Sequence, residues 1–254
     1  MLGRWARRVR GLPASANGAS SLHLWWHLTT PEPLVAASVT IEVLEPPAVD
    51  RLYFWALQVG FHDGRRDRGA GHTGLQWLPA PTGPPRAAVN WGGYRAPPDG
   101  GELEGTASDL PSLDGNANTR LYPWVPGGAY RLAVSRSPRP GSPGWRATVT
   151  DEQGVATVIR DLHGPGAWLT GIGMWSEVFA RCDDPRTVVR WSRPRGRTEA
   201  GEEVAPAGVA VTYQSHAEGG CANTNAEADE VGIRQVTAAE RTVPHGAVLD
   251  LPTP

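Results

Sequence analysis

The sequence contains no lysine, only two cysteines and no long apolar run. All 24 basic residues are arginine, and 26 acidic residues bring the formal net charge to −2. A charge this close to balance argues against a broad nucleic-acid-binding surface. No stretch approaches the roughly 18 apolar residues of a spanning helix. We therefore expect neither a nucleic-acid partner nor a membrane span.

The signatures of well-marked enzymes are missing too. The sequence has no G-x-S-x-G motif, no P-loop, no H-E-x-x-H motif and no G-x-G-x-x-G directly after a predicted strand. Glycoside hydrolysis commonly uses two facing carboxylates, and no spacing identifies such a pair. The sequence predicts no cofactor, and an enzymatic activity without a local signature stays open.

The first twenty residues are basic but do not resemble a secretory leader. The basic residues are Arg4, Arg7, Arg8 and Arg10. They are not followed by the apolar stretch of roughly 7–15 residues that a leader requires. The sequence alone therefore predicts a cytoplasmic protein with a flexible basic segment over residues 1–20 and a single folded domain over residues 21–254.

Turn-forming residues and tryptophan are abundant, with 31 Gly, 24 Pro and 11 Trp. Short runs of alternating apolar residues recur between these turn residues, and helical periodicity is nearly absent. This pattern predicts an all-β protein, an antiparallel β-sandwich of the jelly-roll or concanavalin-like kind. The clearest hairpin is expected around DEQG, at residues 151–154, and residues 193–208 are expected to form a loop.

One predicted strand has a clear apolar face. Every second residue from 53 to 61 is large and apolar: Tyr53, Trp55, Leu57, Val59 and Phe61. Because side chains alternate across a strand, these five should be buried together.

Tryptophan supplies the candidate ligand-binding residues. Aromatic planes can stack on sugar rings, and several aromatic residues lie at predicted strand ends or turns beside amide side chains. The predicted binding set is Trp77, Trp91, Tyr94 and Trp124, with Gln76 and Asn90. Packing of these rings in a β-core is the alternative.

Two regions supply candidate catalytic residues. His62, Asp63 and His72 lie in GFHDGRRDRGAGHTG, where they could form an acid–base pair, a metal site or part of a solvated connection. Glu177 lies two residues after Trp175 on a predicted strand. A carboxylate buried there without a partner would be costly, so we expect it either to pair with an arginine or to serve as a general acid.

Alternating oxygen-bearing side chains offer a second set of metal candidates. They are Asn223, Asn225, Glu227 and Asp229. Such spacing occurs in calcium loops, but Ala228 stands where an EF-hand requires glycine. We therefore predict no metal and interpret the segment as a hydrated loop.

Cys182 and Cys221 are 39 residues apart, each beside turn residues. A bridge between them would stabilise the fold by roughly 3–4 kcal/mol in the chain-entropy model, and only an oxidising compartment would keep it. Two reduced thiols are the alternative. A zinc site would need further ligands near either cysteine.

Several segments resemble a bacterial family of uncharacterised β-rich proteins, found in secreted or lectin-like contexts and particularly in actinomycetes. They are YFWALQVGFHDG, GHTGLQW, AYRLAVSR, GWRATVTDEQGVATVIRDL, WSEVFARCDDPRTVVRWSRP and CANTN, within residues 50–240. The resemblance implies that Cys182 and Cys221 are a family-style cysteine pair and that the protein is extracellular. It supplies no catalytic residues.

Together these patterns predict a non-catalytic, lectin-like protein whose partner is a glycan. The alternative is a glycan-active hydrolase or lyase that uses carboxylate and His residues in a concave face. An interaction protein without a ligand site is a third interpretation. Exposed, coplanar Trp77, Trp91 and Trp124 would favour the first, whereas Glu177 sharing a cleft with a histidine would favour the second.

Overall fold

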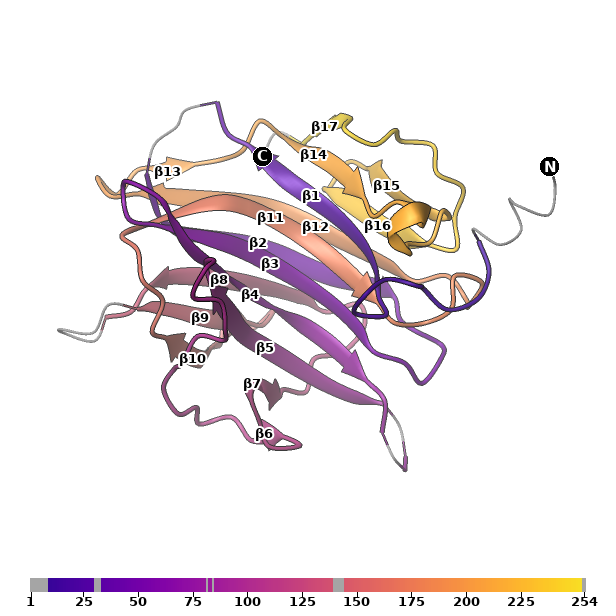
Figure 1. The fold of residues 1–254 in the computed structure, drawn as a ribbon, viewed down its shortest axis with the longest axis horizontal. Helices are drawn as coiled ribbons and strands as arrows, with labels where there is room; N and C mark the ends of the chain where they lie inside the picture. The colour runs from indigo at the N-terminus through magenta and orange to yellow at the C-terminus, as the bar shows by residue number, and fades with distance from the viewer. Residues whose placement is uncertain (1–8, 30–32, 81, 84, 139–143, 253–254) are drawn as a thin grey trace.

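The computed structural model describes residues 9–29, 33–80, 82–83, 85–138 and 144–252, and within these ranges the chain is almost entirely β-structure (Figure 1). One short 3-10 helix, His216–Glu218, interrupts the strands of this part of the chain. The predicted antiparallel β-sandwich is confirmed. Arg4, Arg7 and Arg8 lie outside the described residues.

The strands pair antiparallel and form two sheets. One residue pair, Leu169 with Leu34, connects the two sheets. Sheet 1 runs in the spatial order β17 (Val248–Asp250), β14 (Gly208–Tyr213), β1 (Ser20–His27), β11 (Trp168–Val178), β3 (Tyr53–His62), β4 (Asp67–Leu78), β5 (Arg86–Arg95), β7 (Asn116–Leu121) and β6 (Ser112–Leu113). Sheet 2 runs in the order β15 (Thr224–Ala228), β16 (Ile233–Thr237), β12 (Val188–Thr198), β2 (Leu34–Glu45), β8 (Ala129–Arg136), β9 (Trp145–Thr150) and β10 (Ala156–Leu162), with β13 (Glu203–Val204) paired to β12.

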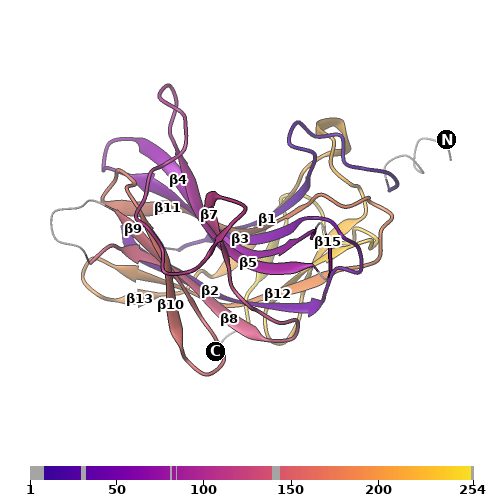
Figure 2. The ribbon, with the colours of Figure 1, turned by 90° about the horizontal axis from the view of Figure 1, so that it is seen from below.

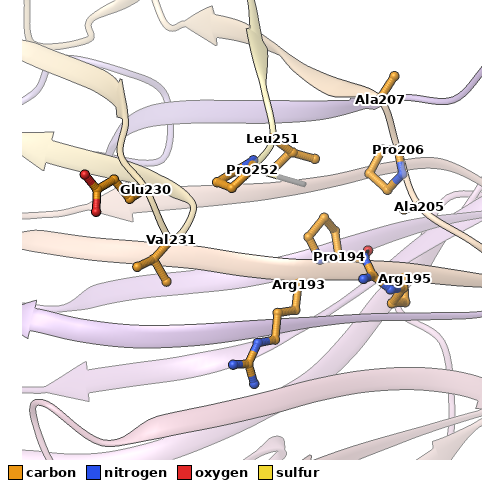
Figure 3. Close-up of a pocket in the computed structure, with 10 residues that line it drawn as sticks. All are labelled: Arg193, Pro194, Arg195, Ala205, Pro206, Ala207, Glu230, Val231, Leu251 and Pro252. Carbon is orange, nitrogen blue, oxygen red and sulfur yellow. Dashed lines mark hydrogen bonds between the residues drawn. The ribbon is translucent and has the colours of Figure 1, made fainter. Parts of the chain in front are cut away.

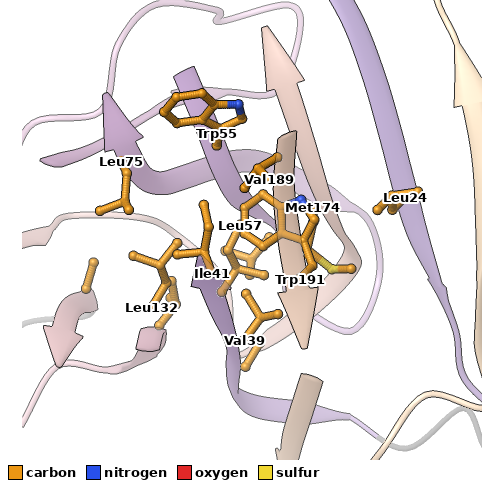
Figure 4. Close-up of a cluster of buried hydrophobic side chains, with 14 of the residues drawn as sticks. Leu24, Val39, Ile41, Trp55, Leu57, Leu75, Leu132, Met174, Val189 and Trp191 are labelled. Atoms are coloured by element: carbon orange, nitrogen blue, oxygen red, sulfur yellow. The ribbon is translucent and has the colours of Figure 1, made fainter. Parts of the chain in front are cut away.

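The hydrophobic core lies between the two sheets. Trp55 and Leu57 of β3 meet side chains of β2 and β12, among them Ile41 and Trp191 (Figure 4). The whole predicted face from Tyr53 to Phe61 is buried, each of its five side chains being at most 1 % exposed. The prediction for this strand is confirmed, since an apolar face of period two has no other stable position.

The expected turns and loops are confirmed only in part. β9 and β10 form the predicted hairpin around Asp151–Gly154. The predicted loop over residues 193–208 is partly wrong, because β12 continues to Thr198 and pairs with β2 through a bulge at Arg193 and Pro194. Residues 223–229 are not a hydrated loop either, since β15 occupies most of them and pairs with β16.

The segment before β1 is in contact with the sandwich. Ala14 N donates to Gly219 O at 2.9 Å, and Gly11 N donates to the carboxylate of Asp183 at 3.0 Å. β1 begins at Ser20. The segment around residues 11–19 therefore lies beside the ends of β1 and β11, where it borders the site described below.

Cys182 and Cys221 form a disulfide with a Cα–Cα distance of 5.5 Å. This confirms the bridge between the segment after β11 and the segment before β15. Within the described residues there is no helix whose length and apolar character would let it cross a bilayer.

Candidate functional site

The side of sheet 1 that faces away from the core, here called the outer face, carries an unusual concentration of aromatic and polar side chains. Sheet 1 is curved, and the outer face lies on the inside of the curve (Figure 2). Because Trp55 and Leu57 point into the core, their neighbours Phe54, Ala56 and Gln58 point to this face.

The strand register brings residues distant in sequence into adjacent rows on this face. In one row Trp25 of β1 stands opposite Gly173 of β11, which stands opposite Gln58, which stands opposite His72 of β4. In the next row His23 stands opposite Trp175. These rows place side chains of four strands within contact distance.

The outer-face cluster, which we define as His23, Trp25, Phe54, Gln58, His72 and Trp175, is centred on Trp175. Its ring centroid lies 4.9 Å from that of Phe54, 5.6 Å from that of His72 and 6.3 Å from that of His23. The indole Nε1 of Trp175 donates to Gln58 Oε1 at 3.1 Å. The His23 and Trp25 rings are stacked, with centroids 5.3 Å apart and planes 3° apart.

Glycine is required beside Trp25. A Cβ atom on Gly173 would lie 2.8 Å from Cε3 of the Trp25 indole. The glycine inside β11 therefore lets the indole lie flat over the neighbouring strand.

Both histidines of the cluster are neutral at pH 7. Burial lowers the pKa of His23 to about 4 and that of His72 to about 4, because a charged imidazolium is poorly solvated there. A neutral imidazole donates one hydrogen bond and accepts another. The cluster thus offers uncharged polar groups between aromatic planes.

Glu177 borders the cluster. Its cross-strand neighbours are Ser21 and Phe54, and its carboxylate accepts a hydrogen bond from Asn17 Nδ2 at 2.9 Å. Burial raises the pKa of Glu177, and the Asn17 hydrogen bond offsets part of that shift. The prediction that Glu177 pairs with an arginine is wrong. Within the described residues, the only hydrogen-bond partner seen for this carboxylate is Asn17, which the segment before β1 supplies.

Gln76 and Asn90 lie on the outer face beyond the cluster. Asn90 Nδ2 donates to Thr119 Oγ1 at 3.2 Å, whereas Asn90 Oδ1 and Gln76 Oε1 are buried without a donor among the described residues. Tyr94 is 53 % exposed, and its ring lies 6.3 Å from that of His72. Tyr94 is therefore placed where it could contact a ligand on this face, whereas the side chains of Gln76 and Asn90 are buried beneath it.

The predicted aromatic platform is not displayed, and this prediction is wrong. Trp91 is fully buried and donates through Nε1 to Trp145 O at 3.0 Å. Trp124 is 3 % exposed, its Nε1 donates to two backbone oxygens, and Trp77 is half-buried against it. Trp91 lies within the sheet because Gly92 and Gly93 continue strand β5 and do not end it in a turn.

The predicted cluster of His62, Asp63 and His72 is not formed. His72 lies in mid-strand opposite Gln58, whereas His62 lies at the end of β3. Asp63 closes a turn by accepting hydrogen bonds from the N–H groups of Arg66 and Arg65, which lower its pKa. His62 and Asp63 therefore organise a loop, and only His72 belongs to the outer-face cluster.

The oxygen-bearing residues near β15 are engaged with protein groups. Asn223 Nδ2 donates to Cys182 O, and Asn225 Oδ1 accepts from two backbone N–H groups. Glu227 pairs with Arg234, and Asp229 pairs with both Arg190 and Arg234. No group of three or more His, Cys, Asp or Glu side chains suited to a metal is found in the described part of the chain.

A hollow of about 630 Å³ lies apart from the outer-face cluster (Figure 3). Pro194, Pro206 and Pro252 line it together with Arg193 and Arg195. It contains none of the residues that the sequence predicted to bind or react. We therefore place the candidate site on the outer face of sheet 1.

Five members of the cluster were not predicted from the sequence: His23, Trp25, Phe54, Gln58 and Trp175. A local signal for them exists. In SLHLWWH the residues His23 and Trp25 alternate with the buried Leu22 and Leu24. The polar or aromatic residue between two core positions is the feature that marks this face.

The class of protein that these features define is an antiparallel β-sandwich with an aromatic and polar outer face. No protein-family model matches the chain, and no curated protein matches it either.

Solved structures are similar in fold. A scytalidoglutamic peptidase with a peptide-based transition-state analogue shares 10 % identity, with a TM-score of 0.47, over 87 % of this chain and 98 % of that one. A second is SCP-B, a member of the eqolisin family of peptidases in complex with the tripeptide Ala-Ile-His; it shares 10 % identity, with a TM-score of 0.48, over 86 % of this chain and 98 % of that one. At this level the similarity concerns the fold.

Proposed function

We propose that the outer face of sheet 1 binds an extended glycan and that Glu177 acts there as the general acid of a hydrolytic or lyase reaction. The observation that carries the proposal is the partly buried carboxyl of Glu177, with a raised pKa, on the same face as neutral His23. A raised carboxyl pKa keeps a proton available closer to neutral pH, which is what a general acid requires.

The relative position of Glu177 and His23 lets both side chains contact the same substrate bond. His23 stands opposite Trp175, and Glu177 follows Trp175 by two residues on the same face. Such diagonal neighbours in an antiparallel ladder lie about 7–8 Å apart. That separation leaves room for a substrate bond between a protonated carboxyl and a neutral imidazole that can hydrogen-bond to the substrate.

The chemistry of the surrounding face supports a glycan as the substrate. Sugars combine apolar ring faces with many hydroxyl groups. Trp25 and Tyr94 supply aromatic planes, while the neutral imidazoles of His23 and His72 supply hydrogen-bonding groups beside them. The groups nearest the centre of the face are uncharged, which suits a neutral polymer better than a charged one.

The experiment begins with a glycan array and continues with hydrolysis assays on each glycan that binds. Product is measured as new reducing ends for hydrolysis and as unsaturated ends for a lyase. A denatured protein is tested as a substrate in parallel, because a polypeptide is the other common type of extended polymer. Glu177→Gln should abolish turnover while leaving binding intact. The matched control is Glu199→Gln, because Glu199 is an exposed carboxylate paired with Arg136. Turnover that survives in Glu177→Gln would remove Glu177 from the reaction.

Binding without turnover is the second candidate function. It is favoured by the neighbours of Glu177, because Ser21 and Phe54 stand where a second carboxylate would be closest. In that case the wild-type protein binds glycans on the array and releases no product. Trp25→Ala would then reduce binding, whereas Glu177→Gln would change it little.

A further inference from the structure

Two buried arginines meet at one end of the sandwich, away from the outer-face cluster. Arg120 comes from β7 near the edge of sheet 1, and Arg160 comes from β10 at the edge of sheet 2. Their cross-strand partners, Val89 and Ala147, are core residues, so both arginines point between the sheets. Arg120 is 9 % exposed and Arg160 is 4 % exposed.

The two guanidinium groups converge on one oxygen. Arg120 Nη2 donates to Ala117 O at 2.9 Å, and Arg160 Nη1 donates to the same oxygen at 2.6 Å and to Asn118 Oδ1 at 3.0 Å. All of these acceptors are neutral. Burial and the neighbouring Arg120 together lower the pKa of Arg160.

Part of the donor capacity of the pair is unused. The Nε atoms of Arg120 and Arg160 are both buried and have no acceptor among the described residues. By contrast, the neighbouring Arg146 forms two hydrogen bonds with the buried carboxylate of Asp161. Two buried like charges without a carboxylate are costly, because each has lost its water and they repel one another.

We propose that a small inorganic anion, chloride in physiological buffers, binds between the guanidinium groups of Arg120 and Arg160 and joins the two sheets there. An anion supplies the acceptor that the buried Nε atoms lack and offsets the repulsion between the two cations. The site takes a small ion because it is crowded: a Cβ atom on Gly105 would overlap Nη2 of Arg160.

The anion site is linked to the outer face through Asn118. Arg160 holds the Asn118 side chain, and a Cβ atom on Gly92 would lie 3.0 Å from Asn118 Cγ. Gly92 stands opposite His72 of the cluster. Arg160, one of the two proposed anion ligands, therefore also holds a side chain next to the candidate ligand-binding face.

Thermal unfolding in chloride or gluconate, at constant ionic strength, tests the anion site in the full chain. A tenfold excess of chloride over its dissociation constant should raise the unfolding midpoint by about 3–6 °C for a chain of this size. Arg160→Met should remove the chloride dependence. The control Arg86→Met should retain it, because Arg86 pairs with Asp114 at an exposed site. Equal midpoints of the wild-type protein in both salts, or a chloride effect that persists in Arg160→Met, would overturn the proposal.

A second measurement does not depend on a variant that folds. Crystals of the wild-type protein soaked in bromide should show an anomalous peak within hydrogen-bond distance of both guanidinium groups. Water alone at that position, with bromide bound elsewhere or nowhere, would overturn the site.

Discussion

The indole Nε1 of Trp175 donates a hydrogen bond to Gln58 Oε1 at 3.1 Å across the β11–β3 ladder. Trp175 is only 5 % exposed although it lies outside the main core. A buried N–H group that loses its acceptor costs about 1–3 kcal/mol. This hydrogen bond therefore holds the centre of the outer-face cluster in one orientation.

Gln58→Ala should accordingly destabilise the protein by about 1–3 kcal/mol, measured as the free energy of unfolding in urea. It should also shift the fluorescence emission of Trp175, because its indole N–H loses its hydrogen-bond acceptor. Gln153→Ala is the matched control, since Gln153 lies in the exposed turn between β9 and β10. Equal losses in the two variants would show that the Trp175 hydrogen bond does not stabilise the cluster.

The two histidines predict a specific dependence of stability on pH. A histidine in the unfolded chain has a pKa near 6.5, whereas burial lowers the pKa of His23 and of His72 in the folded protein to about 4. Between these values the unfolded state binds more protons. The free energy of unfolding should therefore fall as the pH falls from 6.5 to 4, by up to about 1.4 kcal/mol per pH unit for each histidine.

His72→Gln should flatten this dependence because one of the two titrating groups is removed. Glu177 acts in the opposite direction above pH 4.5, because its raised pKa favours the folded state most when it is protonated. The comparison between wild type and His72→Gln isolates the histidine effect. Parallel pH profiles for the two proteins would contradict the neutral state of His72.

The disulfide predicts a large loss of stability on removal. Replacing Cys182 and Cys221 by Ala should lower the free energy of unfolding by about 3–4 kcal/mol in the chain-entropy model. Reductant should lower the unfolding midpoint of the wild-type protein and leave that of the double variant unchanged. A wild-type midpoint insensitive to complete reduction would show that the bridge contributes little.

Aromatic residues of the core and of the outer face should respond differently to truncation. Trp91→Ala should cost about 3–5 kcal/mol because the ring is fully buried. Tyr94→Ala should change stability by no more than about 0.5 kcal/mol, because the ring is exposed, but it should weaken ligand binding. Urea unfolding and calorimetric titration with the bound glycan measure both effects. A Tyr94 variant that is strongly destabilised would assign this ring to packing.

The sequence predicted the sandwich and its central core strand because both follow from local periodicity. Leu57 and Val59 alternate with the less apolar Gln58 and Gly60 within one strand, and burial of one face follows directly. Trp91 was misjudged because the glycines after it were interpreted as a turn. They lie within β5 beside closely packed groups. On the neighbouring strand β4, a Cβ atom on Gly71 would lie 2.7 Å from Cη2 of Trp91.

The composition of the site could not be predicted in the same way. His23 and Trp175 are about 150 residues apart in sequence, and only the pairing of β1 with β11 makes them neighbours. The partner of Glu177 is Asn17, from a segment that the sequence marked only as basic and flexible. Glu177 was recognised because a carboxylate near aromatic residues is costly to bury, whereas His72 was selected only for its nearness in sequence to His62 and Asp63.

The most direct test of the account is the rate of product release by wild-type protein and by Glu177→Gln on a glycan that both bind. If Glu177 is the general acid, the variant should lose a factor of about 10²–10⁴ in rate while its dissociation constant stays unchanged. Equal rates for the two proteins on the same glycan would contradict the assignment of Glu177 and of the outer face as the reactive surface.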